Sequence, residues 1–126
     1  MWDRMDESRD GNGRELNDFM AEKSSRRLML EQSLAENPDD AFLRYGLAMQ
    51  CLREGDIDEG RQRLRSLIAD DPEHQIAAYQ QLGQSYVDSG ETEEATAILR
   101  LGIAKARAAG DGHAAAEMES LVDSLT

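Results

Sequence analysis

The chain of 126 residues has very little of what cross-links a fold or anchors it in a membrane. Its one cysteine excludes an intrachain disulfide and a cysteine-rich zinc site. It contains no apolar run of about 18 residues, so we expect no segment that spans a membrane. The N-terminus lacks the apolar core of a signal peptide, and we therefore expect a cytoplasmic protein.

Basic residues are also scarce beside acidic ones. Lysine and arginine number 14 against 26 aspartates and glutamates, which gives a formal net charge of −12. Basic charge supplies most of the affinity for nucleic acids and for anionic membrane surfaces. We therefore expect neither as a partner, and predict instead a protein or peptide with a basic or apolar segment.

The only two prolines reveal an internal repeat. Pro38 and Pro72 are 34 residues apart and stand in similar contexts, LAENPDD and IADDPEH. Further pairs recur at a spacing of 34 or 35 residues: Leu30 and Leu64, Leu47 and Leu82, and Gly55 and Gly90. A fixed period of this length is typical of stacked helical repeats.

Between these breaks the apolar residues follow helical spacing, and no segment alternates as a strand does. We predict helices near residues 25–36, 40–54, 57–69, 74–88, 92–108 and 112–124. Gly55 and Gly90 stand where a helix commonly ends in the left-handed conformation. Asp56 is expected to cap the following helix in a capping box with Glu59, and Asp111 is expected to cap the last helix.

The spacing of the motif residues resembles that of the tetratricopeptide repeat, W-x2-L-G-x2-Y followed by A-x3-F and P. The matching residues of the second repeat are Tyr79, Leu82, Gly83, Tyr86, Ala95 and Leu99. The first repeat keeps every interval, although Arg44, Cys51 and Gly60 depart from the motif. The resemblance covers about residues 24–126, and the whole chain is similar to small stand-alone bacterial proteins of this family.

This resemblance implies an all-α fold of antiparallel helix hairpins, stacked as a short right-handed superhelix. We predict a mobile arm over residues 1–23 and a helical domain over 24–126, with repeats near 39–72 and 73–108. A lone helix would precede the repeats, and a helix over 111–125 would follow as a cap. The end helices need apolar residues facing the stack, for which we expect Leu28, Leu30 and Leu34 at one end and Met118, Leu121 and Leu125 at the other.

Little in the sequence points to catalysis. His74 and His113 lie beside predicted helix starts and are interpreted as exposed, whereas Cys51 occupies a core position of the family and is interpreted as a buried, inert thiol. Asp70, Asp71, Glu73 and His74 could ligate a metal, but a solvated acidic turn is the preferred interpretation. We therefore predict a protein that is not an enzyme and uses no metal or cofactor.

In the family, the first helix of each repeat lines a concave groove that binds peptides. Carried over by position, the groove residues would be Phe42, Tyr45, Met49, Leu52, Ala77, Gln80, Gln84 and Val87. The resemblance implies an adaptor that binds a protein or peptide; the alternative is a structural subunit that self-associates through the same apolar surface. Both a monomer and a homodimer stay open, as does burial of the apolar residues. Because Tyr45, Met49, Gln81 and Gln84 occupy the positions where some members grip a C-terminal carboxylate with basic side chains, we do not expect that mode here.

Overall fold

The computed structural model describes residues 23–126, and these form six α-helices with no β-strand among them. The helices are α2 (Ser25–Glu36), α3 (Ala41–Arg53), α4 (Ile57–Asp70), α5 (Ile76–Asp88), α6 (Thr92–Ala108) and α7 (Gly112–Asp123). Every predicted helix is confirmed, with each end within two residues of its expected position. The predicted arm falls on residues 1–22 and Lys23, so all but its last residue lies outside the described part.

The helix breaks follow the expected chemistry in all but one case. Gly55 and Gly90 have φ of +84° and +77°, which a residue with a side chain adopts at a cost in strain. Asp111 accepts a hydrogen bond from the backbone N–H of Ala114 and so caps α7. Asp56 is the N-cap residue of α4, but its side chain makes no capping bond. The predicted capping box is therefore wrong.

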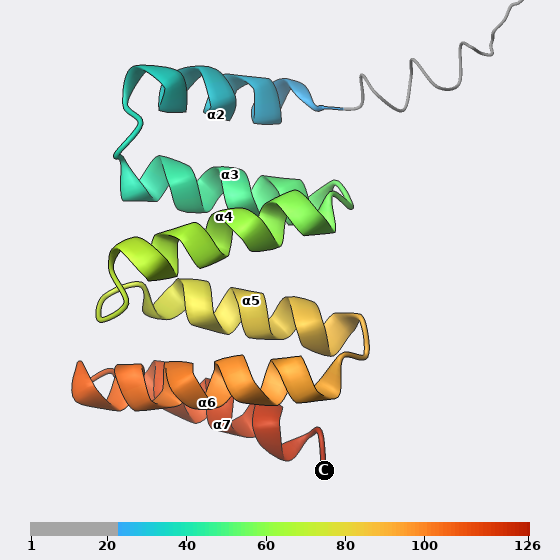
Figure 1. Ribbon diagram of the computed structural model, residues 1–126, viewed down its shortest axis with the longest axis vertical. Coiled ribbons are helices and arrows are strands. Elements are labelled where there is room, and N and C mark those ends of the chain that lie inside the picture. The colour runs from blue at the N-terminus through green and yellow to red at the C-terminus, as the bar shows by residue number, and fades with distance from the viewer. Residues whose placement is uncertain (1–22) are drawn as a thin grey trace, which may run out of the picture.

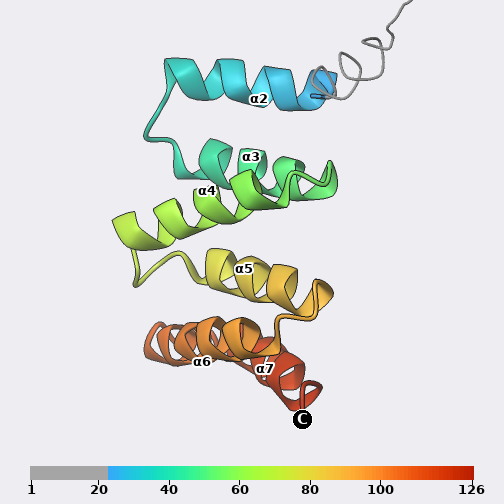
Figure 2. The ribbon, with the colours of Figure 1, turned by 45° about the vertical axis from the view of Figure 1, so that its right-hand side comes forward.

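Successive helices run back and forth in a single stack, from α2 at one end to α7 at the other (Figures 1 and 2). In Figure 1, α4 passes in front of α3, and α6 passes in front of α7. The stack therefore has two long faces. We call the face of α3, α5 and α7 the first-helix face, and the face of α2, α4 and α6 the second-helix face.

The core runs through both repeats, and its residues come from every helix but α2. Its buried residues are Ala48, Leu64, Leu67, Ile76, Ala78, Tyr79, Leu82, Tyr86, Ala95, Leu99, Ile103, Ala106, Ala115 and Met118. Gly83 lies at a close approach of α5 to α6, because a Cβ atom there would collide with the side chain of Leu99. A Cβ on Gly60 would lie 2.6 Å from the Cδ2 atom of Leu52. The motif residues thus serve mainly to pack the helices against one another.

The two ends of the stack differ from one another. Met118 is fully buried, and Leu121 and Leu125 pack partly against the core, as expected for the end formed by α7. On α2, by contrast, Leu28 is 52% exposed and Met29 is 65% exposed. The prediction that Leu28 faces the stack is therefore wrong, whereas Leu30 and Leu34 are half-buried. The one fully buried residue of α2 is Arg27.

Candidate functional site

The first-helix face carries a groove of about 440 Å³ between α3 and α5. Its lining comes from the middle and C-terminal parts of these helices, from the start of α4 and from the C-cap of α5: Met49, Leu52, Arg53, Ile57, Gln81, Gln84, Ser85, Asp88 and Ser89. Apolar side chains come from α3 and the start of α4, and amide, hydroxyl and carboxylate groups come from α5 and its C-terminal turn. The groove therefore offers an apolar wall beside a polar one.

Three of the eight residues expected in the groove line it: Met49, Leu52 and Gln84. Phe42 stands on the same helix as Met49 but is 83% exposed near the start of α3. Tyr45 is half-buried and packs against the core, and burial raises the pKa of its hydroxyl. The groove is thus displaced toward the C-terminal ends of α3 and α5.

The remaining expected residues lie along α5 outside the lining. Ala77 is exposed near the start of the helix, and Val87 packs against the core. Gln80 donates a hydrogen bond from Nε2 to Oε1 of Glu117 on α7, at 3.0 Å. This bond bridges α5 to α7 and engages an amide that was expected to face a ligand.

Five lining residues were not expected from the family positions: Arg53, Ile57, Ser85, Asp88 and Ser89. Four of them lie where helices end or begin: Arg53 and Asp88 are the last residues of α3 and α5, Ser89 is the C-cap of α5, and Ile57 is the first residue of α4. The glycine signals at residues 55 and 90 locate these helix ends in the sequence. They do not show that the two ends face one another.

The groove holds one cation and one anion, and each is hydrogen-bonded to a neutral amide on its own helix. Arg53 donates from Nη2 to Oε1 of Gln50 at 3.2 Å, and Asp88 accepts from Nε2 of Gln84 at 2.8 Å. Neither bond neutralises the charge. Both groups can therefore attract an opposite charge on a ligand.

A buried arginine on α2 fastens that helix to the turn between α3 and α4. Arg27 is 4% exposed and donates from Nη2 to carboxylate oxygens of Asp56 at 2.9 Å and Glu59 at 3.0 Å. Its Nη1 lies 3.4 Å from Oε1 of Glu54. A buried guanidinium forms stronger hydrogen bonds than a helix N–H group does, which explains why Asp56 and Glu59 point toward Arg27 instead of capping α4.

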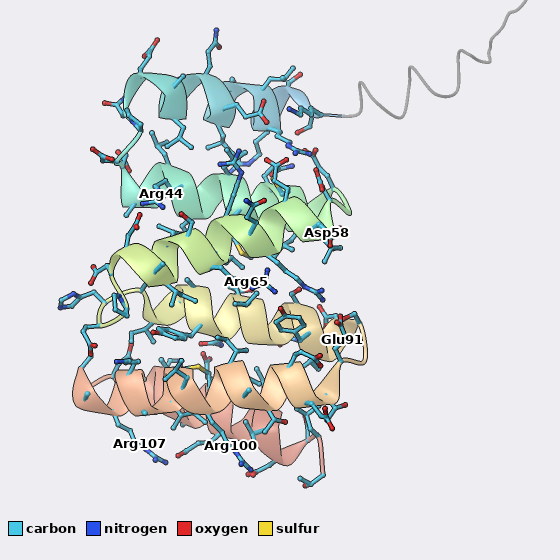
Figure 3. All side chains as sticks on the ribbon, in the orientation of Figure 1. Arg44, Asp58, Arg65, Glu91, Arg100 and Arg107 are labelled. Atoms are coloured by element: carbon cyan, nitrogen blue, oxygen red, sulfur yellow. The ribbon has the colours of Figure 1, made fainter. Side chains whose placement is uncertain are left out.

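The same contact recurs one repeat later with different partners. Arg61 stands 34 residues after Arg27 and is 9% exposed. It donates to the Oγ atoms of Ser85 and Ser89 at 2.6 and 2.9 Å and to Oε2 of Glu91 at 3.0 Å. Glu91 is labelled at the turn between α5 and α6 in Figure 3. We call the two contacts the Arg27 clasp and the Arg61 clasp; the spacing of the two arginines was a signal that the sequence offered.

The side chains that were candidates for catalysis lie apart from one another. His74 and His113 are exposed, as predicted. Cys51 is fully buried, also as predicted, and burial together with nearby Glu59 raises the pKa of its thiol to about 11, which keeps it protonated and unreactive. Across residues 23–126, no group of three or more histidine, cysteine, aspartate or glutamate side chains is arranged so that it could hold a metal ion.

The acids near Pro72 bind separate partners. Asp70 pairs with Arg44 at 2.8 Å, Glu73 pairs with Lys105 at 2.7 Å, and Asp71 accepts from the His74 ring at 2.9 Å. These contacts link α3 to α4 and the α4–α5 turn to α6. The acidic turn thus has a structural role.

The fold defines a class of protein, the short all-α helical-repeat protein. Within the described residues no helix combines the length and the apolar character needed to cross a bilayer. A tetratricopeptide repeat model matches this chain twice, over residues 27–82 and 52–118. The chain belongs to the tetratricopeptide repeat family.

Individual relatives agree with this assignment. A TPR repeat-containing protein of Pseudomonas aeruginosa is 33% identical over 89 residues, which cover 71% of this chain and 84% of that protein. The solution structure of a tetratricopeptide repeat domain protein from Salinibacter ruber has a TM-score of 0.65 at 26% identity, covering 70% of this chain and 88% of that one. A Bordetella parapertussis protein of 24% identity has a TM-score of 0.71, covering 81% and 88%, and supports the fold alone. Proteins of this family generally mediate protein–protein interactions and are generally non-catalytic.

Proposed function

We propose that this protein is a non-catalytic adaptor of the cytoplasm, which binds a protein or peptide in the groove between α3 and α5. The observation that carries the proposal is the groove itself, about 440 Å³ in volume, with apolar and polar walls. Concave sites with an apolar lining and a few placed polar groups are typical of ligand binding. The predicted groove residues that lie outside the lining, above all Phe42 and Tyr45, would extend the contact toward the start of α3.

The chemistry of the walls indicates the kind of segment that fits. Met49, Leu52 and Ile57 can receive an apolar side chain, and methionine adapts its shape to different ligands. Gln81 can hydrogen-bond to the main chain of an extended segment, and Asp88 can pair with a basic side chain. The net charge of −12 further favours a basic segment, whose association slows as the salt concentration rises.

Affinity capture with matched baits tests this proposal. The baits are the wild type, Met49→Glu in the groove, and Leu28→Glu on the exposed surface of α2. We expect a partner that the wild type and Leu28→Glu retain and that Met49→Glu loses, and we expect salt to weaken its capture. A partner retained equally by all three baits would contradict the groove as the binding site.

Self-association through the same apolar surface, the groove together with Phe42 beside it, is the second candidate, and the 83% exposure of Phe42 favours it. An aromatic side chain so exposed is a common anchor of an interface. Sedimentation of the purified chain separates the two candidates. A dimer that Met49→Glu dissociates supports the structural subunit, whereas a groove that binds a different chain supports the adaptor.

A further inference from the structure

The described chain begins next to the groove between α3 and α5. In Figure 1, α2 starts on the same side of the stack as the α3–α4 and α5–α6 turns. Ser24, the N-cap residue of α2, donates a hydrogen bond from Oγ to Oε2 of Glu54, the C-cap residue of α3. Arg53, the residue before Glu54, lines the groove. Residues 1–22 are therefore attached to the helical stack close to this end of the groove.

One buried amide joins this attachment point to the groove. Gln50 is 8% exposed; its Nε2 donates to Oγ of Ser24 at 3.4 Å, and its Oε1 accepts from Nη2 of Arg53 at 3.2 Å. The start of α2 and the cation of the groove are thus connected through a single side chain. A segment that precedes Ser24 needs only a short path to reach the groove.

The groove has an apolar wall and a carboxylate that one ligand segment can satisfy together. Ile57 of the apolar wall is 36% exposed, and Met49 and Leu52 are half-buried. On the polar wall, the carboxylate of Asp88 is exposed and accepts its hydrogen bond from the neutral amide of Gln84. A large apolar side chain with a cation close to it in the sequence matches both features.

The chain before α2 contains a segment of this kind, residues 2–5, with the sequence WDRM. Trp2 is the only tryptophan of the chain, and Arg4 follows it by two residues. Tryptophan and arginine are enriched among the residues that dominate binding at interfaces. Residues 14–22 also contain apolar side chains, but they carry three acids against one base, so the carboxylate of Asp88 would repel them. Charge thus favours residues 2–5 as the occupant of the groove.

The connecting chain is long enough for this contact. Residues 6–22 span up to about 55 Å when fully extended, whereas α3, with its 13 residues, is about 20 Å long. A tethered ligand binds as an intramolecular partner, at an effective concentration of about 1 mM. A segment with an affinity as weak as about 1 mM would therefore fill the groove for half of the time.

We propose that residues 2–5 of this chain occupy its own groove between α3 and α5 when no partner is bound. The indole of Trp2 would lie against the apolar wall that contains Met49, and the guanidinium of Arg4 would pair with Asp88. This inference rests on the proposed function, because the segment would compete with a partner for the same groove. Only a partner that binds more tightly than this internal competitor would displace it.

The fluorescence of Trp2 tests this proposal, because no other tryptophan contributes to the emission. In the purified full chain without a partner, we expect emission at a shorter wavelength than in Met49→Glu. Acrylamide should quench the wild type at least about twofold less than Met49→Glu, because a groove filled for half of the time shields half of the indoles. Leu28→Glu on α2 is the matched control and should behave as the wild type. Circular dichroism should show the same helix content for all three proteins.

A charge exchange tests the pairing of Arg4 with Asp88. Asp88→Arg should expose Trp2 to the quencher, because it sets two cations against each other. Arg4→Asp in the same chain should restore the shielding by reversing the pair. A double variant that stays as exposed as Asp88→Arg alone would overturn this pairing.

Three results would overturn the proposal: equal quenching of Trp2 in the wild type and Met49→Glu, a change of emission in Leu28→Glu alone, or an emission that depends on the protein concentration. The second result would place Trp2 on the exposed surface of α2. The third result would place it in the groove of a second copy.

Affinity capture separates this inference from the proposed function. A Trp2→Ala bait should retain more partner than the wild type, because the internal competitor is weakened. An exposed Trp2, together with a partner that only Met49→Glu loses, would overturn the inference and support the proposed function. A shielded Trp2 without such a partner would support the inference and contradict the proposed function.

Discussion

The two junctions along the stack each contain a buried arginine, Arg27 or Arg61, but they differ in the groups around it. At the N-terminal junction, where α2 meets the α3–α4 hairpin, the buried contact is the Arg27 clasp with Glu54, Asp56 and Glu59. At the C-terminal junction, where α4 meets the α5–α6 hairpin, the Arg61 clasp is joined by buried Leu64, Leu67 and Leu82. The first junction depends mainly on charge and the second mainly on apolar burial.

The two buried arginines stand at equivalent positions of the repeat but bind different partners. Serine hydroxyls and one carboxylate satisfy Arg61, and its guanidinium also lies 4.2 Å from the centre of the Tyr86 ring. Three carboxylates accept hydrogen bonds from the Nη1 and Nη2 atoms of Arg27, whereas its buried Nε has no hydrogen-bond partner within residues 23–126 and lies 3.5 Å from a carboxylate oxygen of Glu31. We therefore expect the N-terminal junction to respond to pH and to open first, and the C-terminal junction to hold until the whole domain unfolds.

The largest expected effect comes from the apolar junction. Leu82 is 1% exposed at the centre of the core, and Leu82→Ala should lower the free energy of unfolding by about 2–5 kcal/mol, because it removes packing and leaves a cavity. Denaturant unfolding measures this loss. Gly83→Leu should also destabilise, since its side chain would collide with Leu99. A Gly83→Leu protein as stable as the wild type would contradict this packing.

Removing the arginine of the N-terminal junction should have a smaller and more local effect. Arg27→Met leaves three carboxylates close together without their cation, and we expect a loss of about 1–3 kcal/mol. Native-state hydrogen exchange should show the loss first in α2. Arg61→Met is the comparison, and its exchange should rise less at α4, because apolar packing holds that helix. Equal opening in the two variants would contradict the difference between the junctions.

The pH dependence should also come mainly from the N-terminal junction. Hydrogen bonds from Ser24 and Gln50, with a further one from Arg27, lower the pKa of Glu54 to about 2, from an ordinary value of 4.5. The folded state therefore binds fewer protons than the unfolded state between these values, so the stability from Glu54 is complete above pH 4.5 and is lost as the pH falls toward 2.

Denaturant unfolding measured across this range tests the assignment. Glu54→Gln should flatten the loss of stability with falling pH. Glu91→Gln is the comparison from the other junction, where a hydrogen bond from Ser89 also lowers the pKa of the carboxyl group; this variant should flatten the curve less if the acid sensitivity arises mainly at the N-terminal junction. A steeper or unchanged curve for Glu54→Gln would show that the acid sensitivity arises elsewhere.

The smallest expected effect concerns binding at Tyr45, beside the groove. Tyr45→Ala should weaken binding of a partner, or self-association through the groove, by at least about 1 kcal/mol and leave the helix content intact. Calorimetric titration with the captured partner measures the first effect, and circular dichroism the second. Leu28→Ala, on the other side of the N-terminal junction, should bind as the wild type does. Equal binding by Tyr45→Ala and the wild type would contradict the extension of the groove toward Phe42.

Much of the fold could be predicted because its signals are local. Helical spacing of apolar residues and the glycines with positive φ at 55 and 90 depend on neighbours within a few residues. The recurrence of Pro38 at Pro72 is a period that can be read directly along the sequence. The motif residues Leu82 and Gly83 then fix how the helices of a hairpin pack. The groove was predicted less well, since Met49, Leu52 and Gln84 line it while Gln80 instead bonds to Glu117.

The sequence by itself thus determined six helices, their limits and the repeat that stacks them, because backbone propensity and capping act over short distances. Only the tertiary structure decided which polar groups meet. Asp56 lies 29 residues from Arg27 in the sequence, and its side chain accepts a hydrogen bond from this buried guanidinium instead of capping α4. A contact over that separation cannot be predicted from a short-range pattern. The same holds for exposure: Leu28 and Leu99 have the same side chain, and only the stacked neighbours bury one and leave the other in solvent.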